Sequence, residues 1–432
     1  MKTDWGRYGR GPVVFLAAVA FIDSVDRGIL PGVLSLVQKD LHFSDSKAGV
    51  LASVFVLTSF VATIPAGYIA DRFRRTYVIG IALAVWGALT AVNAAVRNFA
   101  QFLGVRALLG AGDAVNGPAS NSLLADYYDA SIRGRAYAYT RVAPTVGYAV
   151  GLGVGGAVGS AFGWRAAFLV VGVPGSILAF WMTRVKEPER GESDRIDTSD
   201  SILQSGAERG WQPLLRDVRA VVGVPSLRAL MIGTAISTGA LTGLGYWAAA
   251  FYDRHTSLHG GGSAEVVGVI ILFGAVIGTI LGGRAADRAR ERDLGSPMRL
   301  AGVTQLIAGV ILAATFLHQP LWIRLPAQLV GVAFVVAAFP ALSAMTSQVV
   351  LPQVRGTAFA LSGFLAALAS AISPLLIGLI ADRFPIIVHG QRKGNLATAF
   401  LIVTPLILLG AVVVLNGRRH VEGDMRRVKE TA

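Results

Sequence analysis

Residues 67–75 read Gly-Tyr-Ile-Ala-Asp-Arg-Phe-Arg-Arg, and copies of this stretch organise the whole chain. Residues 283–290 repeat it as Gly-Arg-Ala-Ala-Asp-Arg-Ala-Arg, half a chain length further on. A third copy, Gly-Leu-Ile-Ala-Asp-Arg-Phe, occupies residues 378–384. Each copy lies at the end of a long apolar run. The repeat therefore predicts two related halves, an organisation that is common in secondary transporters.

The composition is that of a membrane protein. The 432 residues are 53% hydrophobic and 15% charged, and the mean hydropathy is +0.58. A soluble domain carries roughly 25% charged residues. This composition excludes a disordered chain and a typical soluble enzyme. The absence of cysteine excludes disulfides, a thiolate nucleophile and cysteine-based metal sites.

The apolar runs predict twelve membrane-spanning helices, since about 20 mostly apolar residues cross a bilayer. The predicted spans are 11–38, 47–70, 76–96, 100–127, 134–162, 164–184, 224–252, 264–286, 298–318, 321–350, 354–381 and 396–416. A polar interruption divides six spans from six. We therefore expect an N-terminal six-helix bundle over 1–185, a linker over 186–222, a C-terminal bundle over 223–417 and a tail over 418–432.

The linker contains a helical pattern and also helps to orient the chain. Residues 211–222 place apolar side chains on one helical face, which indicates either an amphipathic helix on the membrane surface or an ordinary linker helix. The termini, the linker and the loops on the same side carry 26 Lys and Arg residues, against nine on the opposite side. The positive-inside rule therefore predicts that both termini lie in the cytoplasm.

Twelve spans, a long central loop and the Gly-x-x-x-Asp-Arg-x-x-Arg motif after the second span resemble the major facilitator superfamily. The resemblance covers essentially the whole chain. It implies an all-α integral membrane protein with the major facilitator superfamily fold: twelve transmembrane helices in two six-helix bundles with internal repeats. One position departs from the family pattern, because many members have glycine where this chain has Arg74.

Within that superfamily, the N-terminal half is most similar to the Spinster transporters of lysolipids and sphingolipids. Spinster members typically carry Asp-Arg in helix 1, as at Asp26-Arg27, and an Arg followed by Gly-x-Gly-Glu-Ala in helix 4. Here helix 4 carries Arg106 and Gly110-Ala-Gly112-Asp113-Ala114, so aspartate replaces the family's glutamate. The resemblance implies a secondary active transporter that moves amphipathic lipids by alternating access.

Charged side chains inside two spans are the first candidates for function, because ionisable groups at bilayer depth are costly unless paired or hydrated. Asp23, Asp26 and Arg27 share one face of the first span. Arg106, Asp113, Asn116 and Ser120 form a stripe on the fourth. We expect both stripes to line an aqueous cavity. Asp26 or Asp113 is the expected proton carrier and Asp23 the weaker candidate; a static salt bridge between the two helices is the alternative.

A second set of residues is expected to bind substrate. Arg27 and Arg106 suit a phosphate or carboxylate, with Asn116 beside them and Arg141 as a third cation. In the C-terminal half the expected contacts are Tyr246 and Trp247. The half has few charges and many phenylalanines, so a cavity polar on one side and apolar on the other fits an amphipath; the alternative is that these aromatic side chains face lipid or core.

The repeated motif is expected to form a conformational gate. Glycine at the start of the motif permits close helix approach, and the aspartate can pair with a helix N-terminus or an arginine when one side of the transporter closes. The alternative is a loop charge that serves only topology. The expected gate residues are Gly67, Asp71, Arg72, Arg75, Asp287 and Arg288.

No catalytic constellation, Walker motif or convincing metal site is visible, so an enzyme is not expected and no metal or cofactor is expected beyond the coupling proton. Instead we expect a monomer in a bacterial cytoplasmic membrane, with an amphipathic lipid or another small molecule as substrate and no nucleic acid partner. The alternative functions are a proton-coupled organic anion symporter and a drug exporter of the same superfamily.

Overall fold

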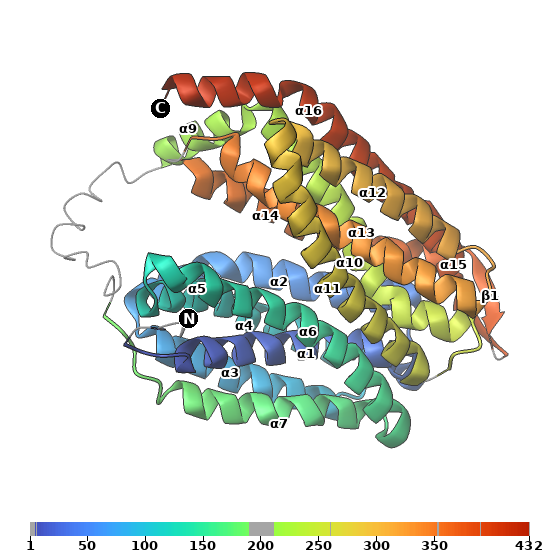
Figure 1. Ribbon diagram of the computed structural model, residues 1–432. Helices are drawn as coiled ribbons and strands as arrows, with labels where there is room; N and C mark the ends of the chain where they lie inside the picture. Colours follow the sequence, from blue (N-terminus) through green and yellow to red (C-terminus); the bar gives the residue numbers. More distant parts are fainter. Residues whose placement is uncertain are drawn as a thin grey trace. The chain divides into compact units, whose positions relative to one another are not determined.

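The computed structural model of the chain is almost entirely helical (Figure 1). It describes residue 5 and residues 7–189, 211–259, 261–351, 354–388 and 390–431. Each of the twelve predicted apolar runs coincides with helical structure. Contacts between Cα atoms divide the chain into two compact units.

The first unit contains Met1–Phe43, Val54–Ala207 and Ser257–Gly268. Its helices are α1 (Gly11–Leu41), α2 (Asp45–Arg72) from Val54 onward, α3 (Arg75–Val92) with the 3-10 turn η1 (Asn93–Ala95), α4 (Phe99–Asp113), α5 (Asn116–Tyr127), α6 (Ala130–Phe162) and α7 (Trp164–Met182).

Small residues allow α1 and α6 to pack closely. A Cβ atom added at Gly151 would lie 2.1 Å from the carbonyl oxygen of Val25, and one at Gly147 would lie 2.3 Å from that of Phe21. Gly28 on α1 has the same relation to α6, since an added Cβ would lie 2.3 Å from a backbone oxygen there. The glycine-rich run in α6 therefore serves close helix packing, as glycine does in many membrane proteins. This packing fixes which face of α1 remains open.

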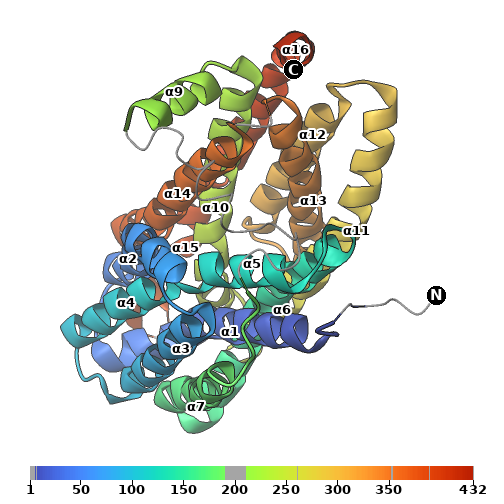
Figure 2. The same ribbon diagram turned by 90° about the vertical axis from the view of Figure 1, so that its left-hand side faces the viewer.

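The fourth predicted span is broken. Helix α4 ends at Asp113 and α5 begins at Asn116 (Figure 2). Pro118 has no backbone N–H to donate to the carbonyl of Ala114, so the regular bonding pattern cannot run through this point. Discontinuous helices are a recurring feature of binding sites in transporters.

The second unit contains Ser44–Ser53, Glu208–Thr256 and Val269–Ala432. Its helices are α9 (Trp211–Val222), α10 (Pro225–His255), α11 (Gly261–Arg292) from Val269 onward, α12 (Ser296–Thr315), α13 (Leu321–Gln348), α14 (Arg355–Arg383), α15 (Leu396–Val403) and α16 (Pro405–Thr431). An antiparallel hairpin of β1 (Pro385–Val388) and β2 (Gln391–Gly394) departs from the all-helical expectation, with Pro385 paired to Gly394.

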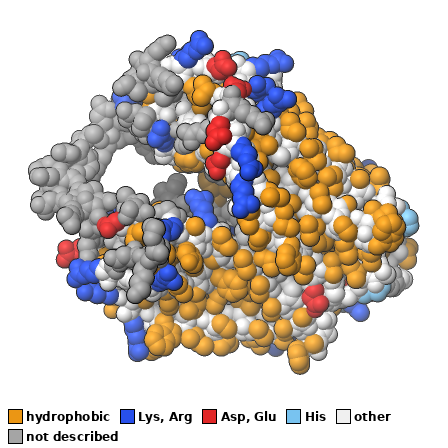
Figure 3. Space-filling model, in the orientation of Figure 1, with side chains coloured by type: hydrophobic (Ala, Val, Ile, Leu, Met, Phe, Trp, Pro, Cys, Tyr) orange, Lys and Arg blue, Asp and Glu red, His pale blue; other side chains and the backbone are white. Residues whose placement is uncertain are grey.

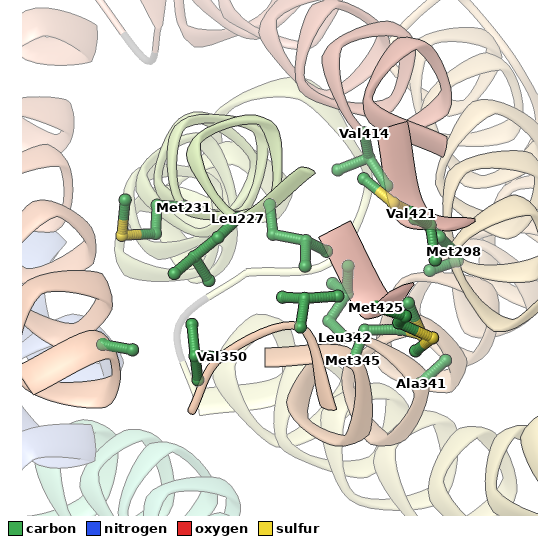
Figure 4. Close-up of a cluster of buried hydrophobic side chains, with 14 of the residues drawn as sticks. Leu227, Met231, Met298, Ala341, Leu342, Met345, Val350, Val414, Val421 and Met425 are labelled. Carbon is green, nitrogen blue, oxygen red and sulfur yellow. The ribbon is translucent and has the colours of Figure 1, made fainter. Parts of the chain in front are cut away.

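A buried apolar cluster joins several helices of the second unit (Figure 4). Leu227 of α10, Met298 of α12, Leu342 of α13 and Val421 of α16 meet there. Val221 of α9 belongs to the same cluster and is fully buried. The predicted helix in the linker is therefore present, and its end is packed against the second unit.

The two units exchange short segments that sequence order alone did not predict. The first turns of α2 belong to the second unit, and the first turns of α11 belong to the first. At the C-terminus, α16 continues as helix to Thr431, through most of the expected tail. The boundaries expected at residues 185, 222 and 417 stay predictions.

In the part of the chain that the structure describes, ten helical segments are long and apolar enough to cross a membrane. The first and fourth predicted spans do not meet that measure. Charges interrupt α1 at Asp23, Asp26 and Arg27, and the fourth span is divided between the short helices α4 and α5. Elsewhere, apolar side chains cover wide areas of the surface viewed in Figure 3. The two least lipid-like spans are the ones that carry the candidate site.

Candidate functional site

A cavity of about 560 Å³ lies within the first unit. Helices α1, α2, α5 and α6 and the break between α4 and α5 supply its lining. The charged lining residues are Asp23, Arg27, Asp113 and Arg141. Hydroxyl and amide groups surround them, from Ser24, Ser59, Thr63, Asn116, Ser120, Asn121 and Thr140. The volume is within the usual range of small-molecule sites.

Arg27 lies between two carboxylates in this cavity. Its Nη2 atom donates to Oδ2 of Asp23 at 2.9 Å, one helical turn away on α1. The same nitrogen donates to Oδ1 of Asp113, at the end of α4. Ser59 on α2 donates to the other oxygen of Asp113 at 2.9 Å. Three helices therefore meet at one shared guanidinium.

The side chains of this group differ in exposure. That of Arg27 is 43% exposed, whereas those of Asp23 and Asp113 are 8% exposed each. A guanidinium remains charged at any physiological pH, while a carboxylate can take up a proton. If both arginines and both aspartates are ionised, the charges in the cavity cancel. Protonation of one aspartate leaves the cavity with a net positive charge.

Asp26 and Arg106 do not face this cavity, contrary to the expectation that they would line it. The Asp26 side chain is fully buried, and Thr90 of α3 donates to it at 3.3 Å. Arg106 lies 4.0 Å from Asp26 and is 4% exposed. Its guanidinium lies 5.5 Å from the ring of Phe102 and 5.4 Å from that of Phe168. Asp26 and Arg106 thus form a buried ion pair beside aromatic rings, which we call the dry pair. Helix α1 directs Arg27, the next residue, toward the cavity and Asp26 away from it.

The other predicted contact residues are divided between the units. Asn116 and Arg141 line the cavity, and Arg141 is exposed. In the second unit, the hydroxyl of Tyr246 donates to the carbonyl of Ala48 at 2.8 Å, and the indole of Trp247 donates to that of Pro374 at 2.9 Å. Both rings are buried. These two aromatic side chains therefore support packing within the second unit, and their polar atoms are engaged by backbone.

Among the predicted gate residues, Arg75 has the most contacts. It is 2% exposed and donates to Ser122 at 2.8 Å, to Asp126 at the end of α5, and to Glu187 beyond α7 at 3.2 Å. Burial acts to raise the pKa of Glu187, but the hydrogen bonds donated by Arg75 and Thr76 outweigh it and lower the pKa overall. Arg75 thus holds three chain segments of the first unit together.

The remaining gate candidates are less engaged. Arg72, Asp287 and Arg288 are exposed, and the side chain of Asp71 lies outside the described part of the structure. A Cβ atom added at Gly67 would meet no described heavy atom within 4 Å. The close helix approach expected at this glycine is therefore not seen here. At Arg74, φ is −63° and ψ is 118°, a conformation open to any residue, so the family's glycine is not required.

A second polar network escaped the sequence analysis. Arg254 of α10 forms two hydrogen bonds of 2.7 Å with the carboxylate of Asp45, in the first turn of α2. Asp382 of α14 accepts from the backbone N–H groups of Asp45 and Ser46 at 3.2 and 2.8 Å. Asp382 is the aspartate of the third motif copy, so the repeat itself was the available signal. It caps the start of α2 within the second unit.

The cavity hydroxyls were also missed. Ser59 and Thr63 are four residues apart in an otherwise apolar stretch of α2, which places them on one face. That spacing was the signal that could have identified them. Among the residues that the structure describes, no group of three or more His, Asp or Glu side chains could hold a metal ion.

Comparisons with known proteins agree with this architecture. Residues 16–374 match the sequence profile of the Major Facilitator Superfamily. An MFS-type efflux pump of Mycolicibacterium smegmatis is 27% identical over 92% of this chain and 90% of its own length. The Probable L-galactonate transporter of Escherichia coli is 25% identical over 91% of this chain and 89% of its own.

A solved structure extends the comparison to three dimensions. It is a bacterial homolog to the human lysosomal transporter Spinster, in an inward-facing and unoccupied conformation. The TM-score is 0.83 at 20% sequence identity, covering 98% of this chain and 99% of that one. At this identity the likeness concerns the fold.

Proposed function

Since the chain belongs to the Major Facilitator Superfamily, and is thus a multi-pass membrane transporter and not an enzyme, we propose that it moves amphipathic lipids by proton-coupled alternating access. The proposed substrates are lysophospholipids or sphingolipid-like molecules with an anionic head. The single observation that carries the proposal is the sharing of Arg27 between Asp23 and Asp113 in the cavity. We propose a bacterial cytoplasmic membrane as the location, with both termini in the cytoplasm because of the excess of basic residues on that side.

In the proposed mechanism, an anionic head competes with the Asp113 carboxylate for Arg27, and a proton on Asp113 favours the anion. With both aspartates ionised, Arg27 is fully compensated and has little attraction for an anion. Protonation of Asp113 removes one of its two partners, so the guanidinium can bind a phosphate or carboxylate. Release of the proton restores the pair and expels the anion. Asp23 holds the arginine in place on α1 throughout the cycle.

The proposed gate lies at the two ends of helix α2. At one end, Arg72 is the last residue of α2, and Arg75, the first residue of α3, ties α3 to α5. At the other end, Asp382 and Arg254 hold the first turn. Alternating access requires contacts at the two ends of a transporter to form and break in turn. We assign Asp71, Asp287 and Arg288 to the same gate from their places in the repeat.

Two features support a lipid as substrate. Along α1, the cavity lining passes from the apolar Leu16, Val19 and Ala20 to the charged Asp23 and Arg27. An amphipath presents the same division between an apolar chain and a charged head. The resemblance of the N-terminal sequence to the Spinster transporters of lysolipids favours the same class of substrate.

A small organic anion is the second candidate substrate. Most of the cavity lining is polar, and the similarity to the Probable L-galactonate transporter favours an acid without an acyl chain. The proton step at Asp113 would be the same for this substrate. The similarity to the efflux pump suggests a drug exporter as another alternative. That function would give no role to the anion binding proposed for Arg27.

The test is uptake into liposomes that contain the purified protein. Labelled lysophosphatidylglycerol and labelled galactonate are compared with and without an imposed proton gradient. We expect gradient-stimulated movement of the lipid, and loss of the stimulation in Asp113→Asn. Asp40→Asn is the matched control, because Asp40 forms an exposed pair with Arg165 at the far end of α1. Movement of galactonate alone would replace the lipid with an organic anion, and gradient-independent movement would remove the proton from the mechanism.

A further inference from the structure

A second hollow of about 610 Å³ lies on the first unit, separate from the cavity just described. Nine of its ten lining residues are apolar or glycine or tyrosine, and the tenth is Arg74. The wall on α3 includes Tyr77, Ile81 and Val85, all of which are exposed. We propose that this groove binds one acyl chain of an anionic phospholipid of the surrounding bilayer, with the lipid phosphate on Arg74.

The polar and apolar parts of the groove are arranged as in a lipid. Arg74 precedes the first residue of α3, so it lies at the helix end, where a head group is expected. From Tyr77 to Val85 the apolar wall extends for about 12 Å along the helix, at 1.5 Å per residue. A chain that enters at Arg74 therefore finds continuous apolar contact in the direction of the membrane interior.

Arg74 is available to an anion. Its side chain is 63% exposed, and its guanidinium lies 4.7 Å from the ring centroid of Tyr77. Its Nε atom forms a long ion pair with Glu187, at 3.8 Å, but that carboxylate accepts its hydrogen bonds from Arg75 and Thr76, which leaves the exposed guanidinium able to contact a phosphate. The guanidinium fork matches a phosphate, and its stacking on tyrosine holds it beside the groove. This charge is the reason for assigning an anionic phospholipid to the groove and not a neutral one.

The groove also reaches the break between α4 and α5 from the side opposite to the cavity. Gly112 and Val115 line the groove, whereas Asp113 and Asn116 line the cavity. A bound chain would contact residues on either side of the carboxylate that holds Arg27. The proposed lipid is a resident of the bilayer and not the transported substrate, so this inference does not rest on the substrate proposed above.

The experiment measures lipid binding directly. The protein is purified in detergent, stripped of lipid, and titrated with phosphatidylglycerol or phosphatidylcholine under native mass spectrometry. We expect a tight phosphatidylglycerol site that is weakened about tenfold in Arg74→Gln, the loss of one charge-assisted contact. Arg184→Gln is the matched control, because Arg184 is also exposed and stacks on an aromatic ring, at 4.0 Å from that of Phe180, outside the groove.

A second pair of variants tests the acyl chain. Val85→Trp narrows the groove and should weaken both lipids, whereas Val92→Trp places the same ring on an exposed position of α3 outside the groove and should weaken neither. A phosphatidylglycerol with a photoreactive chain should crosslink to residues 77–85. The proposal is overturned if Arg74→Gln binds phosphatidylglycerol as tightly as the unaltered protein. It is also overturned if each variant and its control lose the same affinity, or if crosslinks form only on other helices. Ile81→Trp replaces Val85→Trp if the latter does not yield folded protein.

Discussion

Two ion pairs include side chains from the same turn of α1, but they differ in exposure. One lies at the cavity and the other is buried. Asp23 and Arg27 face the cavity with Asp113, and the Arg27 side chain is 43% exposed. Asp26 faces α3 and α4, where its side chain and that of Arg106 are 0% and 4% exposed. The chemistry is the same, but water reaches only the first group. A hydrated pair can exchange a proton or an anion, whereas a dry pair must remain intact because an isolated buried charge is costly.

The largest expected effect comes from breaking the dry pair. Arg106→Met leaves the carboxylate of Asp26 buried and uncompensated, which typically costs about 3–5 kcal/mol. We expect a large fall in the apparent melting temperature of the detergent-solubilised protein, measured by the change in tryptophan fluorescence on heating. The double variant Asp26→Asn with Arg106→Met should recover much of the loss. If Arg106→Met melts like the unaltered protein, the pair is not dry.

The next effect should be on substrate binding and not on stability. Arg27→Ala removes the hydrated guanidinium, so binding of an anionic lysolipid should weaken by about tenfold or more, as expected for a charge-assisted contact. A zwitterionic lysolipid should lose less. Arg27→Lys retains the charge without the planar guanidinium, so its affinity for the anionic lysolipid should lie between those of Arg27→Ala and the unaltered protein. Binding is measured by isothermal titration with each lipid, and equal loss for both lipids would indicate structural damage.

The role of the proton separates the two groups most clearly. Asp26→Asn should lower stability but leave the dependence of uptake on the proton gradient intact, since no cavity water reaches Asp26. Asp113→Asn should leave stability intact but abolish the dependence of uptake on the proton gradient. The measurement is uptake at several imposed gradients, together with a melting curve for each variant. Loss of gradient dependence in Asp26→Asn alone would move the proton site into the dry pair.

A carboxylate in the second unit should show an intermediate effect on stability. Asp382 accepts from two backbone N–H groups at the start of α2, so it acts as a helix cap with neutral partners. Asp382→Asn should cost about 1 kcal/mol, and Asp382→Ala up to about 2 kcal/mol, in the same melting assay. Asp293→Ala, which removes an exposed pair with Arg418 in the same unit, serves as the control. Equal melting of Asp382→Ala and the unaltered protein would show that the cap is dispensable.

The smallest effect is expected outside the spans, at Glu187. Because the folded state lowers the pKa of this carboxyl, Glu187 stabilises the fold at pH values above its usual pKa. That stabilisation should be lost as the pH falls through the lowered pKa. Glu187→Gln should therefore narrow the difference in melting temperature between pH 7 and pH 4. An unchanged difference would mean that Glu187 contributes nothing to acid sensitivity.

Local features of the chain were sufficient for the fold. Apolar runs of sufficient length predict spans wherever they occur, because each helix satisfies its own backbone hydrogen bonds in lipid. The motif copies then predicted two halves, and the third copy contains Asp382, which caps α2. The glycine-rich run of α6 is also a local feature of the sequence, and it packs closely against α1. None of these inferences needed to know which helices are neighbours.

The site depended on the rotation of each helix, which only tertiary packing decides. Asp23 and Asp26 are three residues apart, about 60° around α1 at 100° per residue. The sequence by itself placed both on one face, and the contacts of α1 with α6 and α3 then put Asp23 at the cavity wall and buried Asp26 beside Arg106 and its aromatic neighbours. The same holds for Arg106 and for Tyr246 and Trp247, whose residue types suggested binding but whose neighbours engage them within the fold. Sequence determined which charges enter the membrane, and tertiary structure decided which of them meet the cavity, because burial depends on the neighbouring helices.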